Sequence, residues 1–124
     1  FKGFLLIFFF VLPYNNRLIK RKDFERVRKF GIFSSHRCVA TKILKNGLSE
    51  TRVGFVAGLK FSKKAVDRNL VKRRLREIFH TQLQEIQKGL DIVVMMKKGG
   101  REDVSYDQLK QDVGQIFKNY KINF

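Results

Sequence analysis

The sequence predicts a single-domain α+β fold with the element order α-β-β-α-β-α, in which helices pack on a central mixed sheet. The chain has 124 residues, the usual size of one domain with one hydrophobic core. No internal repeat, glycine-serine linker or low-complexity tract divides residues 15–124. A long helical pattern stands between two strand patterns, and such strands commonly share one sheet that helices cover.

The N-terminal residues 1–14 are predicted to be an apolar extension that is not part of the fold, which we place in residues 15–124. Residues 4–12 form an unbroken apolar run, shorter than the about 20 residues that a membrane-spanning helix needs. The residues that follow this run differ from the small-residue cleavage site of a signal peptide. We therefore expect no export and no membrane partner.

The first helix is predicted in residues 22–30, because apolar residues recur there at a spacing of three. These residues are Phe24, Val27 and Phe30. Asp23 is a candidate N-cap, and Gly31 is expected to end the helix.

Two β-like stretches follow, at residues 39–44 and 52–59. Between them lies Asn46-Gly47, a dipeptide that hairpin turns favour because it tolerates positive φ. We expect the two strands to pair antiparallel. Alternating apolar residues of the second strand are expected to face a core, namely Val53, Phe55 and Ala57.

A long helix is predicted in residues 65–87, which contain no glycine or proline and carry a one-sided apolar stripe. The stripe consists of Val71, Leu75, Ile78, Phe79, Leu83 and Ile86. Gly89 is expected to end this helix, and the apolar run at residues 91–96 predicts a strand covered on both faces. Ser105 is expected to cap a last helix that runs to about Tyr120. Its apolar face consists of Leu109, Val113, Ile116 and Phe117.

The charge of the chain predicts a polyanionic partner. Lysine and arginine total 27 against 11 acidic residues, which gives a net charge of +16. Nucleic acid is favoured over an anionic membrane, because membrane binding usually needs a basic amphipathic helix or a lipidation signal. The single cysteine, Cys38, can form no intramolecular disulfide, which fits a cytoplasmic location.

The densest charge lies between Lys60 and Arg76, where eight basic residues stand against Asp67 alone. On a helix, residues 68, 72 and 76 form a basic ladder on the side away from the apolar stripe. Such a face can neutralise several phosphates and release their counterions. The alternative is a merely solvated face, but solvated faces usually mix both signs of charge. Nucleic-acid binding is therefore favoured.

The sequence gives no indication of catalytic or metal-binding residues in the protein. The only histidines, His36 and His80, lack a second histidine or a cysteine at metal-ligand spacing. The acidic pairs at residues 23 and 25 and at residues 102 and 103 are typical of helix ends and turns, not of a metal-dependent nuclease. Residues 98–101 lack the spacing of a nucleotide-binding loop.

Residues 64–79 resemble the signature helix of the bacterial ribonuclease P protein subunit, whose pattern is Ala-Val-x-Arg-Asn-x-x-Lys-Arg-x-x-Arg. Supporting similarity lies in Arg17-Leu18, in Asp23-Phe24 with Val27, and in Arg52-Val53-Gly54. The resemblance covers about residues 15–121.

The resemblance implies a protein that binds a catalytic RNA and the 5′ leader of precursor tRNA, and so promotes endonucleolytic 5′ maturation of tRNA. Catalysis belongs to the RNA, with magnesium bound mainly by that RNA, no organic cofactor and one protein per RNA. The resemblance also implies a left-handed crossover between parallel strands, whereas pattern alone would predict the right-handed form.

The resemblance further assigns residues to the two RNA partners. The signature helix and the preceding loop would contact the catalytic RNA through Lys60, Lys63, Lys64, Arg68, Asn69, Lys72, Arg73 and Arg76. A cleft between the first helix and the sheet would bind the leader through Arg17, Phe24, Arg28 and Lys42. For Phe24 a core-facing position is the equal alternative, because it also belongs to the apolar face of its helix.

The sequence departs from the family pattern at a few positions. Arg28 and Lys42 stand where many members carry aromatic residues, which predicts a more electrostatic recognition of the leader. Ser62 replaces a common glycine, and Leu70 replaces a basic residue next to Asn69. The competing functional class is a general RNA-binding protein of the ribosomal or chaperone type, and a membrane-bound basic protein is the third.

Overall fold

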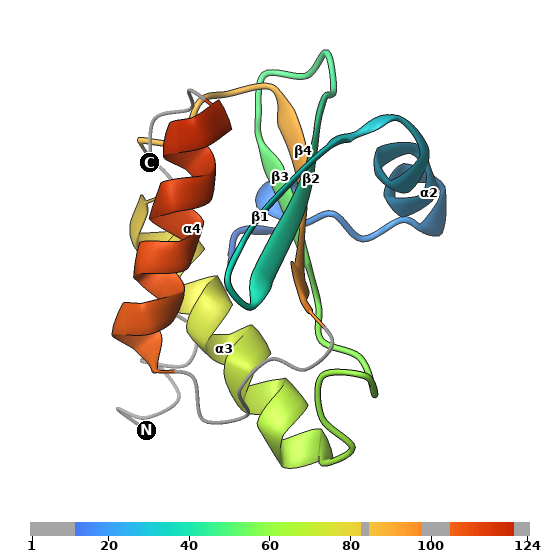
Figure 1. The fold of residues 1–124 in the computed structure, drawn as a ribbon. Helices are drawn as coiled ribbons and strands as arrows, with labels where there is room; N and C mark the ends of the chain where they lie inside the picture. Colours follow the sequence, from blue (N-terminus) through green and yellow to red (C-terminus); the bar gives the residue numbers. More distant parts are fainter. Residues whose placement is uncertain (1–11, 83–84, 98–104, 121–124) are drawn as a thin grey trace, which may run out of the picture.

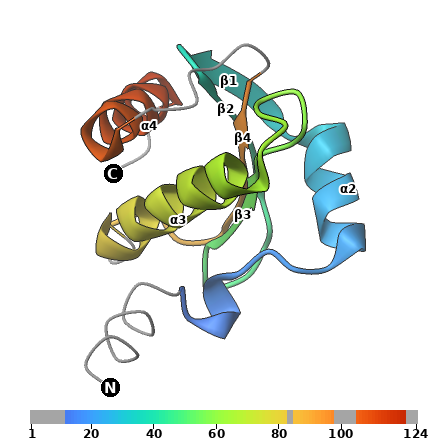
Figure 2. The ribbon, with the colours of Figure 1, turned by 90° about the horizontal axis from the view of Figure 1, so that it is seen from below.

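The computed structural model describes residues 12–82, 85–97 and 105–120, and these form three layers. A four-stranded mixed sheet carries α3 (Ala65–Gln82) and α4 (Tyr106–Tyr120) on one face (Figure 1). Helix α2 (Arg21–Phe30) lies on the opposite face, as the view along the layers shows (Figure 2). A short 3-10 helix, η1 (Tyr14–Asn16), precedes α2. The predicted α+β class is confirmed.

The sheet has the strand order β1-β2-β4-β3, with β4 (Leu90–Met96) in its interior. Strand β4 is antiparallel to β2 (Val39–Lys45) and parallel to β3 (Arg52–Val56). Nearly every residue of β4 is buried, which confirms the prediction of a strand covered on both faces.

The predicted hairpin between β2 and β3 is wrong, because β4 lies between these two strands. A strand that is apolar on both faces buries the most apolar surface at the centre of a sheet. Strand β4 therefore takes the place beside β2 that the local turn signal assigned to β3. Asn46 accordingly bonds within the connecting loop and to β4, although Gly47 does adopt the positive φ of +72°. Strand β3 ends at Val56, and Leu59, predicted as its last residue, is exposed.

Strand β1 (Ile32–His36) was not predicted, so the observed order is α-β-β-β-α-β-α. It pairs antiparallel with β2 at the edge of the sheet. Its residues 34–36 are polar, and it joins β2 through Arg37 at φ +54° without a glycine or asparagine. The usual hairpin signal is therefore missing from the sequence.

The main core lies between the sheet and the pair α3 and α4. The predicted apolar faces are confirmed, because residues 71, 75, 78 and 79 of α3 and residues 109, 113, 116 and 117 of α4 are all buried. Phe79 makes edge-to-face contacts with Phe55 and Phe117, with ring centroids 5.5 and 5.7 Å apart. The Ser105 hydroxyl accepts a hydrogen bond from the Gln108 amide at 3.2 Å, as expected of an N-cap.

The predicted C-terminal limit of α3 is wrong. The helix ends at Gln82, and Ile86 is buried although it lies beyond the helix. Leu83, the remaining residue of the predicted stripe, lies outside the described residues. Gly89 has a φ of +82° directly before β4, so it shapes the entry to the strand instead of the helix end.

Helix α2 covers a smaller apolar cluster on the other face of the sheet. Leu18, Val27 and Val93 are buried in this cluster, with Phe24 packed beside them. The N-cap of α2 is Lys20 and not Asp23, which lies in the first turn. Phe30 does not belong to the apolar face, because 67% of it is exposed.

Most of the predicted N-terminal extension, residues 1–11, lies outside the described residues. Leu12, which we had assigned to that extension, is buried in the main core. Asn16 donates a hydrogen bond to the Thr51 carbonyl at 2.9 Å, which anchors η1 beside β3. Among the described residues, none of the helices has the length and apolar character needed to cross a membrane.

Candidate nucleic-acid interface

The basic residues predicted to bind RNA lie along one face of α3 and the loop before it. Asn69, Arg73 and Arg76 are exposed, and Arg68 and Lys72 are half-buried. Lys60, Lys63 and Lys64 are exposed in the loop. The predicted position away from the buried stripe is wrong for Arg68 and Lys72. At 3.6 residues per turn, Arg68 lies about 20° around the helix from the buried Leu75, so these two cations flank the stripe, whereas Arg73 and Arg76 are exposed to solvent.

Ser62 fixes the loop that leads into α3. Its buried hydroxyl donates a hydrogen bond to the Asp67 carboxylate at 3.0 Å and accepts one from the Lys64 amide at 3.1 Å. The Arg68 guanidinium donates to the Ser62 carbonyl at 2.9 Å. Ser62 therefore ties the loop to the first turn of the helix.

A hollow of about 360 Å³ lies between the N-terminal segment, α2, β3 and α3. It brings together Arg17 and Phe24, two predicted leader-binding residues, and Arg76 of the basic face. The remaining lining residues are Leu12, Leu18, Ile19, Val53, Gly54 and Phe55. Arg76 therefore belongs both to the basic face of α3 and to this hollow.

The wall of the hollow depends on pairing between the N-terminal segment and β3. Arg17 forms a parallel bridge with Val53, and the Leu18 amide donates to the Val53 carbonyl at 3.0 Å. The Arg17 side chain donates to the Leu12 carbonyl at 2.7 Å. These contacts hold the Arg17 side chain at the edge of the hollow.

Phe24 is half-buried, so it both packs on the sheet and lines the hollow. Its ring lies directly over Gly54, where an added Cβ would come within 2.4 Å of the ring atom Cζ. Gly54 was not among the site residues predicted from the sequence. A glycine inside a strand often marks such a close approach, and this signal was present in the sequence.

The other two predicted leader residues lie at the C-terminal end of α2 and do not line the hollow. The Lys42 ammonium donates to the Arg28 carbonyl at 2.6 Å, and so caps the end of the helix. The Arg28 guanidinium forms an exposed ion pair with Glu25 at 2.7 Å. The hydrogen bond from Arg28 lowers the pKa of Glu25.

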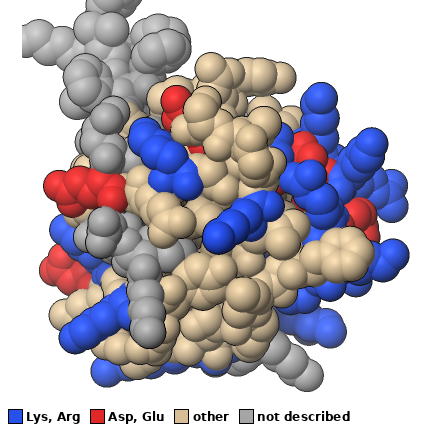
Figure 3. All heavy atoms as spheres, turned by 90° about the horizontal axis from the view of Figure 1, so that it is seen from above, with Lys and Arg blue, Asp and Glu red and all other residues tan. Residues whose placement is uncertain are grey.

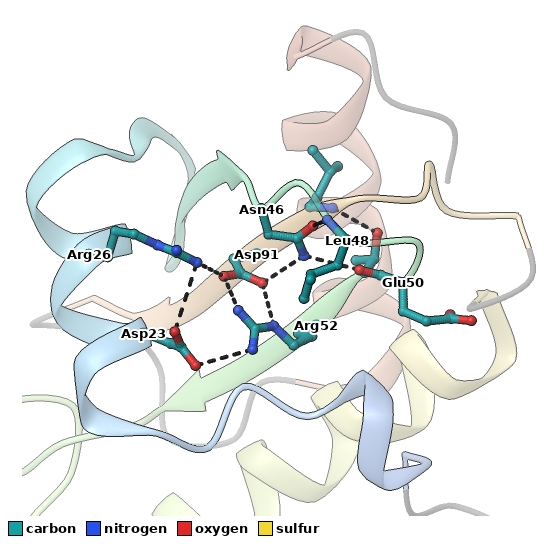
Figure 4. A network of polar contacts seen from close by, with 9 residues as sticks. Asp23, Arg26, Asn46, Leu48, Glu50, Arg52 and Asp91 are labelled. Carbon is teal, nitrogen blue, oxygen red and sulfur yellow. Dashed lines mark hydrogen bonds and ion pairs between the residues drawn. The ribbon is translucent and has the colours of Figure 1, made fainter.

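A buried polar network holds α2 against the ends of β2, β3 and β4 (Figure 4). Its centre is the fully buried carboxylate of Asp91, which Arg52 contacts through two nitrogens at 2.8 and 2.6 Å. Arg26 and Asn46 donate to the same carboxylate at 2.8 and 2.9 Å. Arg52 also bonds Asp23 at 3.1 Å, which fixes the first turn of α2 and hence the position of Phe24.

Electrostatics keeps this network charged. Burial acts to raise the pKa of Asp91, but hydrogen bonds from Arg52, Asn46 and Arg26 outweigh it and leave the pKa below its ordinary value. The hydrogen bonds that Arg52 donates to the Asp91 carboxylate raise the pKa of Arg52. The role of this network is structural, because it positions the helix that carries Phe24.

Positive charge dominates the surface around α2 as well as α3. Lys and Arg side chains gather over the α2 side of the molecule, with few acidic residues among them (Figure 3). Within the described ranges, no group of three or more His, Cys, Asp and Glu side chains could hold a metal ion. His36 instead lies 3.9 Å from the buried carboxylate of Asp112.

Comparison with known proteins places this fold and these motifs in one family. The chain matches the Ribonuclease P family over residues 12–121. The ribonuclease P protein component of Pseudanabaena sp. (strain PCC 6903) is 36% identical over 113 residues, which are 90% of this chain and 97% of that protein.

Two solved structures agree in fold. The RNase P protein of Staphylococcus aureus has a TM-score of 0.77 at 27% identity, over 86% of this chain and 96% of that one. The RNase P protein of Thermotoga maritima has a TM-score of 0.73 at 34% identity, over 83% and 96% of the two chains. The chain therefore belongs to the ribonuclease P protein family, whose role is the 5′ processing of tRNA as part of an endoribonuclease complex.

Proposed function

We propose that this chain binds the catalytic RNA of ribonuclease P through the basic face of α3 and the unpaired 5′ leader of precursor tRNA through the hollow at Phe24. The observation that supports this best is the position of Arg76, which lies on the basic face and also lines the hollow. A single protein surface could thus hold the catalytic RNA and the substrate leader next to each other.

The chemistry of the two surfaces suits these two partners. Arginine and lysine along α3 neutralise phosphates of a folded RNA and release its counterions. In the hollow, an aromatic ring beside arginine can stack an unpaired base while the cation holds the backbone. We assign catalysis to the RNA, with magnesium held mainly by that RNA, no organic cofactor and one protein per RNA. The cytoplasm is the proposed location.

Reconstitution tests this proposal. The chain is mixed with a bacterial ribonuclease P RNA at a magnesium concentration too low for the RNA alone, and removal of the leader from precursor tRNA is measured. We expect cleavage at the mature 5′ end only when both components are present, because the protein lowers the repulsion between two polyanions.

The controls separate this function from its alternatives. Protein free of RNA is expected to leave precursor tRNA intact, and cleavage by the protein alone would overturn the assignment of catalysis to RNA. A general RNA-binding protein would bind unrelated structured RNAs with equal affinity and would not restore cleavage. That outcome would favour the ribosomal or chaperone class.

Replacement of Arg73 by alanine is expected to weaken binding of the catalytic RNA and to reduce the log–log salt slope by about 1. Arg73 is exposed on the basic face. It is a better probe than Arg68, whose bond to the Ser62 carbonyl also stabilises the loop. The measurement is the dissociation constant over a series of salt concentrations.

Lys118→Ala is the matched control, because it removes the same charge from an exposed position on α4. Its salt slope is expected to equal that of the unaltered protein. If Arg73→Ala and Lys118→Ala both kept the salt slope of the unaltered protein, the basic face of α3 would be a solvated surface that does not bind RNA.

A further inference from the structure

Asp67 is the one acidic residue among the eight basic residues between Lys60 and Arg76, and the proposed function does not use it. A carboxylate at this place repels the phosphates of an RNA that lies on the basic face of α3. Electrostatics alone therefore predicts that Asp67 weakens RNA binding. Its contacts, however, connect it to the loop that carries three of the predicted RNA-binding cations.

The loop that joins β3 to α3, residues 57–64, is anchored in its middle. The side chain of Phe61 is buried in the main core. The amides of Phe61 and Ser62 both donate to the Gly58 carbonyl, at 3.0 and 3.3 Å. The two lysines that end the loop follow these anchors and are exposed, so their position depends on contacts between the loop and α3.

Ser62 makes the contact between this loop and Asp67 in the first turn of α3. The buried Ser62 hydroxyl donates to the Asp67 carboxylate at 3.0 Å and accepts from the Lys64 amide at 3.1 Å. A serine hydroxyl has one proton, which must point away from the Lys64 amide if its oxygen is to accept that bond. Because the carboxylate takes this proton, Asp67 orients the hydroxyl for its bond to Lys64.

Arg68 holds the backbone of the same serine. Its guanidinium donates to the Ser62 carbonyl at 2.9 Å, and its amide donates to the Lys64 carbonyl at 3.2 Å. Two successive residues of α3, Asp67 and Arg68, thus bond the side chain and the backbone of Ser62. Together these bonds fix the backbone of Lys63 and Lys64 relative to the helix.

We propose that Asp67 is a positioning residue for the catalytic RNA, which acts through the Ser62 hydroxyl to hold Lys63 and Lys64 beside the basic face of α3. This inference rests on the proposed function and adds a residue to it. A preformed surface binds more tightly, because the loop and its side chains need not become ordered on binding. This gain exceeds the repulsion between one carboxylate and the RNA phosphates, which salt screens.

The test measures the dissociation constant of the full chain for a bacterial ribonuclease P RNA, at a temperature at which circular dichroism shows each variant to be folded. Asp67→Ala is expected to weaken binding on the order of three- to tenfold, although it makes the chain more positive by one charge. Ser62→Ala removes the hydroxyl and is expected to weaken binding to a similar extent. The double variant is expected to bind no more weakly than either single variant.

Asp67→Asn separates the hydrogen bond from the charge, because asparagine keeps an oxygen that can accept from the Ser62 hydroxyl but has no negative charge. This variant is expected to bind the RNA at least as tightly as the unaltered protein. Asp107→Ala is the matched control, because Asp107 is an exposed carboxylate in the first turn of α4. It changes the net charge as Asp67→Ala does, and it is expected to cause no weakening.

The outcomes distinguish this inference from the proposed function. If the unaltered protein neither restores leader cleavage nor prefers the catalytic RNA to unrelated structured RNAs, the proposed function fails and the role of Asp67 falls with it. If both are observed but Asp67→Ala binds the RNA as tightly as the unaltered protein or more tightly, Asp67 is a repulsive charge only and the inference is overturned. Equal weakening by Asp67→Ala and Asp67→Asn would overturn it too, because the effect would then come from the charge and not from the bond to Ser62.

Discussion

Replacement of Asp91 by alanine is expected to lower the free energy of unfolding by about 3–5 kcal/mol, the usual cost of breaking a buried ion pair. The carboxylate of Asp91 is fully buried and accepts hydrogen bonds from Arg52, Arg26 and Asn46. Without this carboxylate, the largely buried side chain of Arg52 keeps its bond to Asp23 but loses both of its bonds to Asp91. Urea denaturation at neutral pH measures the change.

Glu25→Ala is the control, because it removes an exposed carboxylate from the same side of the molecule. An exposed ion pair contributes little to stability, so the urea midpoint of this variant is expected to stay close to that of the unaltered protein. Equal stability of the two variants would mean that the network does not hold α2 on the sheet.

The pH dependence of stability is expected to follow from the same carboxylate. The pKa of Asp91 is lower in the folded protein than its ordinary value, which the unfolded chain regains. The contribution of Asp91 is therefore fully present above the ordinary aspartate pKa of about 3.9 and is lost as the pH falls toward the lower folded value. Asp91→Asn should show a smaller loss of stability over this acidic range.

The helices and the central strand could be predicted from the sequence because burial imposes a local periodicity on them. In α3 the buried residues Val71, Leu75 and Ile78 recur at helical spacing, and no distant partner is needed to recognise this pattern. Strand β4 is apolar throughout, which indicates burial on both faces wherever its neighbours come from.

Strand pairing could not be predicted because it depends on residues far apart in the sequence. The local signal Asn46-Gly47 favoured a hairpin, but the Asn46 amide donates to Asp91, 45 residues away, at 2.9 Å. Once β4 lies beside β2, β3 can pair only with its other edge. The edge strand β1 was missed because it is short and its second half is polar.

In the candidate site, too, the features that depend on local spacing could be predicted, and those that depend on contacts between distant residues could not. The basic ladder of α3 is a local feature, so helical spacing was enough to place Arg68, Lys72 and Arg76 on one side. The hollow depends on the bridge between Arg17 and Val53, which no local pattern encodes. The predicted leader residues consequently separate into two groups at opposite ends of α2.

Gly54→Ala is expected to displace the Phe24 ring and to reduce the preference for precursor over mature tRNA by about 1–3 kcal/mol, the usual contribution of one stacked base. The new Cβ would lie 2.4 Å from Cζ and 2.8 Å from Cε1 of Phe24, and 3.3 Å from Cβ of Leu18. Because the closest atoms are at the far end of a side chain, the ring can move while the strand keeps its place. The loss of stability is therefore expected near the lower end of the about 1–3 kcal/mol typical of overpacking.

Phe24→Leu separates stacking from packing, because leucine keeps apolar volume on Gly54 but lacks an aromatic face. If Phe24 stacks a leader base, Phe24→Leu is expected to reduce the preference for precursor over mature tRNA by the same amount as Gly54→Ala. The double variant with both changes is then expected to show no further reduction of this preference. Gly114→Ala on α4 is the control, because no atom lies within 4 Å of its added Cβ, and it should stabilise the helix by about 0.5–1 kcal/mol. If Gly54→Ala and Phe24→Leu both kept the full preference for precursor tRNA, Phe24 would be a packing residue only. Leader binding would then depend on Arg17 and on the cations at the C-terminal end of α2.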